Sequence, residues 1–221
     1  MKFTSLLRQP LNVLASAVLA TTLLAAAPTA QAQSFNLVQT STPTGGAIGA
    51  NSLSDTAWLA ERFETTGSVR IDSVMAYLLS DDATGDLGKS FTLALYADVN
   101  NLPGLNFNAP NDGKLFQASA TYNGDGWNGL SQLNWQLGAG KYWLAVEAGS
   151  GANDAGWLLA PVGAQPAANV ALYSGGQHYA AIGSSDTFGL AIVATPVPEP
   201  TGLALMLASL GALSLVARRR A

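Results

Sequence analysis

VRIDSVMAYLL, residues 69–79, is the stretch of this sequence that decides the fold. Its apolar residues recur at every second position, which is typical of a β-strand with one buried face. The apolar residues that share one parity are Val69, Ile71, Met75, Tyr77 and Leu79. We therefore predict a strand here, with these five side chains directed into the core.

The same alternation recurs on both sides of this stretch. It is found in the sets Phe91, Leu93, Leu95; Leu133, Trp135, Leu137; and Tyr142, Leu144, Val146. Further predicted strands are residues 114–122, 156–159, 168–173 and 188–194, separated by turn-rich stretches at 80–88, 100–104, 123–129 and 149–155. Residues 54–63 are predicted as one short helix or a strand. Many short strands without long helices predict an all-β, antiparallel β-sandwich or jelly-roll-like domain over residues 33–195.

The charges of this domain exclude one class of partner. Residues 33–200 contain five basic and fourteen acidic residues, a net charge of −9. Such a surface repels phosphates, so we expect no nucleic-acid partner. The chain has no cysteine, which removes disulfides, thiolate metal sites and thiol nucleophiles from consideration.

Residues 1–32 have the three parts of a secretory signal peptide. A basic start with Lys2 and Arg8 precedes an apolar stretch, residues 11–27, and the small-residue sequence Ala30-Gln31-Ala32 follows. Cleavage after Ala32 would leave Gln33 as the first residue of the exported chain. The alternative is an N-terminal membrane anchor, which requires a longer apolar span.

Residues 196–221 form a second targeting segment. The sequence Val197-Pro198-Glu199-Pro200 is followed by an apolar run, residues 201–217, and then by Arg218, Arg219 and Arg220. Seventeen helical residues span about 25 Å, slightly less than the hydrocarbon layer of about 30 Å. The arginines would stay on the cytoplasmic side, which places the domain outside. The two prolines keep the motif extended, because they lack backbone donors and disfavour helix.

This order of Pro-Glu-Pro, apolar helix and terminal arginine cluster resembles the PEP-CTERM sorting signal of exported proteins in exopolysaccharide-producing Gram-negative bacteria. The resemblance implies that a membrane-embedded exosortase recognises Pro198, Glu199 and Pro200 after export by the secretion machinery. It also implies that the tail, with residues 201–217 as the membrane segment and Arg218 to Arg220 as the stop, is held in the inner membrane transiently and then removed. The alternative is an ordinary C-terminal anchor with a proline-rich hinge.

A looser resemblance covers residues 35–195. The stretches AWLAERF (57–63), LYAD (95–98) with Pro103-Gly104, and KYWLA (141–145) are similar to exported choice-of-anchor domains. The resemblance implies a β-rich surface module and carries over no functional residue.

Catalytic residues are not evident in this sequence. A Ser-His-Asp hydrolase would have to use His178, the only histidine, which lies in a glycine-rich loop; the chain has no Gly-x-Ser-x-Gly elbow. Glycoside hydrolysis needs two facing carboxylates, and the glutamates of the domain are Glu61, Glu64 and Glu147. Glu147 alternates with the apolar residues of its strand. We interpret these groups as a surface histidine and solvated charges.

Two weaker interpretations concern ligands. Oxygen-rich loops could hold Ca²⁺, and the residues concerned are Asp81, Asp82 and Asp86 in one loop and Asp98, Asn100 and Asn101 in another. The alternative is that these residues supply turn chemistry and solubility, and we predict no cofactor. Tryptophans on a sheet face can stack on sugar rings, and the candidates are Trp127, Trp143 and Trp157, with Trp143 directed outward by its parity. The alternative for most tryptophans is core packing.

The sequence therefore predicts an exported, non-enzymatic protein of the cell surface or extracellular matrix, sorted by its tail, with exopolysaccharide as a candidate partner. The alternative function is a secreted carbohydrate-active enzyme or carbohydrate-binding module with a C-terminal anchor.

Overall fold

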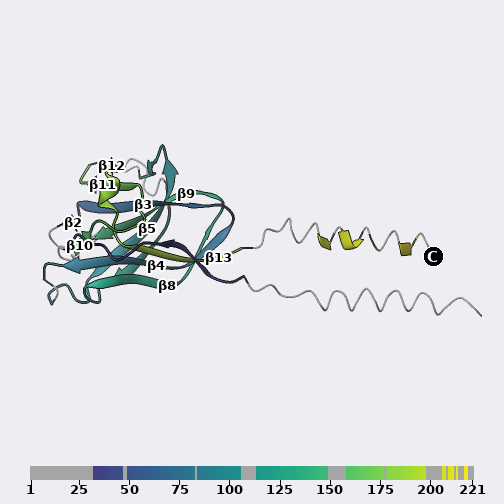
Figure 1. Cartoon of the computed structure of the whole chain (residues 1–221), viewed down its shortest axis with the longest axis horizontal. Coiled ribbons are helices and arrows are strands. Elements are labelled where there is room, and N and C mark those ends of the chain that lie inside the picture. The colour runs from purple at the N-terminus through teal and green to yellow at the C-terminus, as the bar shows by residue number, and fades with distance from the viewer. Residues whose placement is uncertain are drawn as a thin grey trace, which may run out of the picture. The chain divides into compact units, whose positions relative to one another are not determined.

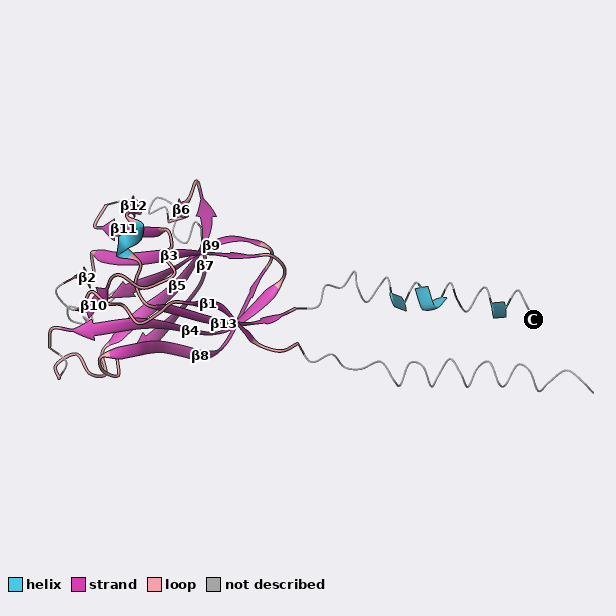
Figure 2. Cartoon of the chain, viewed as in Figure 1, coloured by secondary structure: helices cyan, strands magenta, loops and turns pink. Residues whose placement is uncertain are grey.

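The computed structural model describes residues 32–46, 49–82, 84–105, 113–148, 158–176 and 178–197, together with eight residues between 206 and 218. The described part of the chain forms thirteen strands and one short 3₁₀ helix, η1 (Ser184–Asp186), and the eight described residues between 206 and 218 are helical (Figures 1 and 2). None of the helices among the described residues is long and apolar enough to span a membrane. The predicted signal helix and membrane helix therefore remain predictions.

The strands form two antiparallel sheets. In the six-stranded sheet the order is β1 (Phe35–Gln39), β13 (Leu190–Pro196), β4 (Val69–Ser80), β10 (Leu158–Pro161) and β2 (Ala50–Leu53), with β8 (Gly126–Leu137) also paired to β4. In the seven-stranded sheet it is β12 (Ala180–Ile182), β11 (Val170–Ser174), β3 (Ala57–Thr65), β9 (Gly140–Ala148), β5 (Ser90–Val99) and β6 (Leu102–Pro103), with β7 (Lys114–Thr121) also paired to β5. The prediction of an all-β antiparallel architecture is confirmed, and residues 57–65 are a strand.

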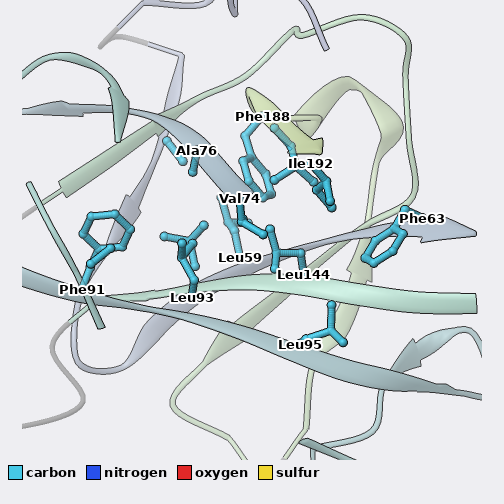
Figure 3. Packing of buried hydrophobic residues seen from close by; sticks show 14 of the residues in the cluster. Leu59, Phe63, Val74, Ala76, Phe91, Leu93, Leu95, Leu144, Phe188 and Ile192 are labelled. Carbon is cyan, nitrogen blue, oxygen red and sulfur yellow. The ribbon is translucent and has the colours of Figure 1, made fainter. Parts of the chain in front are cut away.

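The main core lies between the two sheets, because its buried side chains come from both. Figure 3 shows Leu59, Leu93 and Leu144 of the seven-stranded sheet packed near Val74 and Ile192 of the six-stranded sheet. All five side chains have no exposed surface. Burial of this apolar area is the main stabilising contribution in a domain without disulfides.

The prediction of which β4 side chains face the core is correct up to Ile71 and wrong afterwards. Val69 and Ile71 are buried, but Met75, Tyr77 and Leu79 lie on the outer face. The buried residues of the second half are Val74, Ala76 and Leu78. In the pairing of β4 with β13, Asp72 is an extra residue between Ile71 and Ser73, and one extra residue in a strand exchanges its two faces.

The first and last strands of the domain are neighbours. Phe35 at the start of β1 pairs with Ala194 near the end of β13, so the chain enters and leaves the domain at the same end. Beyond β13, the backbone N–H of Val197 donates a hydrogen bond of 2.9 Å to the carbonyl of Ser68. The described fold therefore continues to the residue that precedes Pro198.

Candidate functional site

The outer face of the seven-stranded sheet is apolar at its centre. Four buried alanines form a row across the strands there, and buried aromatic residues surround this row. The alanines are Ala171, Ala60, Ala145 and Ala94, in the order of the strands; the aromatic residues, which we call the outer aromatic cluster, are Trp58, Tyr96, Trp143, Tyr173 and Tyr179. Trp58 stacks on Tyr173 with ring centroids 4.4 Å apart. This sheet is therefore buried on both faces at its centre.

Glu147 belongs to this outer face, and its interpretation as a solvated charge is wrong. Its side chain is 1% exposed. One carboxylate oxygen accepts a hydrogen bond from the Tyr96 hydroxyl, and the other lies 3.1 Å from Lys114 Nζ. Lys114 also lies over the Tyr96 ring, 5.2 Å from its centroid. Because a buried carboxylate needs charged and hydrogen-bonding partners, this trio is a structural unit.

The tyrosines beside Glu147 are held in their neutral form. Burial, followed by the negative charge of Glu147, raises the pKa of Tyr96 far above its ordinary value of 10. The same two causes raise the pKa of Tyr179, whose hydroxyl is buried without a hydrogen-bond partner among the described residues. Neither phenol can therefore act as a base near neutral pH.

Glu61 is also buried, on the opposite face of the same sheet. Its side chain is 1% exposed and shares the inner face with Leu59 and Phe63. Burial raises its pKa from 4.5 to about 8, and a hydrogen bond from the backbone of Phe188 partly offsets this rise. One carboxyl oxygen has no partner among the described residues. Glu61 is therefore a neutral carboxylic acid in the core near pH 7, and its interpretation as a solvated charge is also wrong.

The arrangement of the glutamates matters for the hydrolase alternative. Glu61 lies in the core between the sheets, Glu147 lies on the outer face, and Glu64 is exposed near the end of β3. Glycoside hydrolysis requires two carboxyl groups that flank one bond. The two buried glutamates cannot meet this requirement, because a sheet separates them. His178 is exposed, as expected.

The candidate tryptophans have different environments. Trp143 is 1% exposed, so the prediction that it faces outward is correct for the sheet face but wrong for solvent exposure; its indole N–H donates to Asp98 over 3.2 Å. Trp127 is half-buried on the outer face of the six-stranded sheet, where its ring lies edge-on to Tyr77 with centroids 5.6 Å apart. Trp157 lies outside the described residues.

The calcium candidates are divided between two ends of β5. Asp81, Asp82 and Asp86 precede the strand, whereas Asp98 lies near its end, about 30 Å away for a strand of this length. Asp86 is buried, accepts a hydrogen bond from Ser80 and forms an ion pair of 2.7 Å with Lys89. Asp82 accepts a hydrogen bond from the backbone N–H of Gly85. Within the described ranges, no three carboxylate or histidine side chains converge on one point.

We expect millimolar Ca²⁺ to leave the melting temperature of the full-length chain unchanged, because Asp86 already pairs with Lys89, Asp82 accepts from Gly85, and Asp98 accepts from Trp143. Differential scanning fluorimetry with Ca²⁺, and with Mg²⁺ as a control, measures this. A rise of several degrees specific to Ca²⁺, lost in the Asp81→Ala, Asp82→Ala double variant, would contradict the expectation.

The sorting residues are only partly described. Ala32 and Gln33 are exposed residues before β1, Val197 is the residue bonded to Ser68, and Arg218 is exposed. The remaining residues of the predicted signals lie outside the described residues: Ala30, Pro198, Glu199, Pro200, Arg219 and Arg220.

Sequence reasoning missed the partners of Glu147, namely Tyr96 and Lys114. The signal that could have found them is the apolar character of both faces of β3, β9 and β5. A strand that is apolar on both faces is covered on both, so a carboxylate among Trp143 and Ala145 should have been predicted as buried.

Comparisons with known proteins find no matching family model and no matching curated protein. The solved structures that match include two of Cwp84, from Clostridium difficile in the first and described as clostridial in the second. One contains the cysteine protease and lectin-like domains of this surface layer associated protein, with a TM-score of 0.45 and 16% identity over 65% of this chain and 33% of that chain. The other, the protease after propeptide cleavage, has a TM-score of 0.47 and 15% identity over 77% and 41%. The chain spans only about a third to two fifths of the Cwp84 chains, and likeness at these values carries no conclusion about activity.

Proposed function

We propose that this protein is an exported, non-enzymatic component of the cell surface or extracellular matrix, sorted through its C-terminal tail. The observation that carries the proposal is the sequence of the tail, in which Pro198-Glu199-Pro200, an apolar segment and three arginines follow one another. Export itself is supported by the signal-peptide pattern of residues 1–32.

The structure supports this proposal at the boundary between the domain and the tail. β13 ends at Pro196, and the hydrogen bond of Val197 to Ser68 is the last one before the motif. Asp72 accepts hydrogen bonds from Thr195 and Arg70 and helps to fix this end of β13. A folded domain that stops one residue before Pro198 would present the motif as the first extended segment outside it.

The non-enzymatic part of the proposal is supported by the buried glutamates. Glu61 and Glu147 are used by the core and by the outer aromatic cluster, on opposite faces of one sheet. This separation counts against the alternative of a glycoside hydrolase that uses these two carboxyl groups.

Substituting Glu199→Ala is expected to leave an unprocessed, membrane-held protein, because the apolar helix and its arginines remain while the recognition element is lost. Deleting residues 201–221 is expected to release the domain unsorted into the periplasm or medium. The measurement is the C-terminal peptide, by mass spectrometry, of protein from the membrane and surface fractions of a host that carries an exosortase.

The matched control for this experiment is Glu64→Ala, which removes an exposed glutamate from the domain and should leave processing unchanged. Residues 218–221 still attached to the surface form of the unmodified protein would show that the tail is a plain anchor, and would overturn the sorting proposal.

A further inference from the structure

The outer face of the six-stranded sheet carries an aromatic platform that the sorting function does not use. It consists of Tyr77 and Trp127, which pair directly across β4 and β8, and Met75, one position along the same face. All three side chains are half-buried, so part of each remains open to solvent. Tyrosine and tryptophan combine a flat apolar ring with a polar group, which suits them to ligands with both properties.

Two glycines shape this platform. A side chain at Gly129 would collide with the carbonyl of Val74 and would lie 2.9 Å from the Met75 sulfur. A side chain at Gly189 would collide with Tyr77 and would lie 3.1 Å from Pro43. Without these side chains, Met75 and Tyr77 lie close to the neighbouring strands, and the Tyr77 ring meets the Trp127 ring edge-on, with an interplanar angle of 84°.

The two cross-strand rows of this face that follow Tyr77 and Trp127 contain polar and apolar residues and no charged residue. Residues paired directly across antiparallel strands share a face. The cross-strand row that contains Met75 reads Gln39, Ala191, Met75 and Gly129, and the row beyond it reads Asn36, Val193, Ser73 and Ser131. The amides and hydroxyls of these rows, which we call the rim, belong to Gln39, Asn36, Ser73 and Ser131. They both donate and accept hydrogen bonds. The face is about 14 Å wide across four strands, and thus wider than one sugar ring.

Charged groups lie at the two ends of this face and already have partners. Asp72 at one end pairs with Arg70 at 2.7 Å, and Asp125 at the other end accepts hydrogen bonds from the backbone of Ser80 and the hydroxyl of Tyr122. In a region with a net charge of −9, a face whose paired rows contain no charge suits a neutral partner better than an ionic one.

We propose that this face binds a neutral polysaccharide, with a pyranose ring on the Tyr77–Trp127 pair and its hydroxyl groups bonded to the amide and hydroxyl rim. Aromatic rings contact the apolar face of a sugar, and amides and hydroxyls satisfy its polar edge. This inference rests on the proposed function, because an exported matrix protein meets such polymers outside the cell.

The test measures binding of the full-length chain, purified in mild detergent, to the neutral and acidic fractions of the extracellular polysaccharide of the producing bacterium. Affinity electrophoresis should show binding to the neutral fraction and little to the acidic fraction. Trp127→Ala should weaken binding about tenfold or more, because it removes the larger ring of the platform. Trp127→Phe should restore part of the affinity.

The matched control is Phe35→Ala, which removes an aromatic side chain that is 40% exposed on the same sheet but outside the platform. It should not change binding, and circular dichroism should be the same for all variants. Binding that is absent, that favours the acidic fraction, or that survives Trp127→Ala would overturn the proposal. If the chain self-associates but binds no sugar, and Trp127→Ala abolishes this self-association, the face binds a second copy of the chain. That result would also overturn the proposal. Sorting is measured separately by the C-terminal peptide, so either proposal can fail alone.

Discussion

Replacing Lys114 with methionine is expected to lower the free energy of unfolding by about 3–5 kcal/mol, because Glu147 would be left as a buried carboxylate without its cation. Glu147 is 1% exposed, and the side chain of Lys114 is 15% exposed, so water cannot substitute fully for the lost partner. Urea denaturation of the purified chain, followed by tryptophan fluorescence, measures the change.

The double variant Lys114→Met, Glu147→Gln should recover much of this loss, since a neutral pair of similar volume removes the unpaired charge. Lys141→Met is the control: this lysine is exposed on β9, the strand that carries Glu147, and its replacement should change stability by less than about 0.5 kcal/mol. If Lys114→Met behaved like Lys141→Met, Glu147 would not depend on the ion pair.

The second large effect concerns Glu61 and pH. Its pKa is about 8 in the folded protein and 4.5 ordinarily, so between these values the unfolded chain has lost a proton that the folded chain retains. Stability contributed by the neutral carboxyl is therefore fully present below pH 4.5 and is lost as the pH rises towards 8. Between pH 5 and 8 the free energy of unfolding should fall by on the order of 4 kcal/mol from this group alone.

Glu61→Gln should remove most of this fall, so that the variant becomes the more stable protein at pH 8. Denaturation at several pH values measures the difference between the variant and the unmodified chain. Glu64→Gln, an exposed glutamate on the same strand, is the control and should follow the unmodified chain. A difference for Glu61→Gln that does not change with pH would show that Glu61 is ionised in the folded protein throughout this range.

The sequence predicts the fold class well because period-two alternation is a local property. It appears in β5, β9 and the second half of β8 without knowledge of their neighbours. β1, β2 and β12 were not predicted, since these strands are short and pair at or near sheet edges, where their sequences, FNLVQ, ANSL and AAI, need no apolar alternation. The buried face of β4 after Ile71 was predicted wrongly, because the extra residue Asp72 arises in the pairing of β4 with β13, a strand distant in sequence.

The environment of the glutamates shows a second limit. The alternation of residues in β9 correctly places Glu147 on the outer face of the sheet. It does not show whether side chains from other parts of the chain cover that face. The covering residues, such as Tyr179, are distant in sequence from β9. Glu61 shares the parity of Leu59 and Phe63, so its burial was readable from the sequence, whereas its rise in pKa depends on how completely the two sheets bury it.

The position of β13 has a mechanical consequence. The tail continues from β13, and this strand lies between β1 and β4 and not at the edge of its sheet. If the tail is held while a ligand pulls on the domain, the load acts along β13, perpendicular to the hydrogen bonds of both ladders. All of these bonds then share the force at once and cannot be peeled off one by one, so the domain should withstand traction at the strand by which it is tethered.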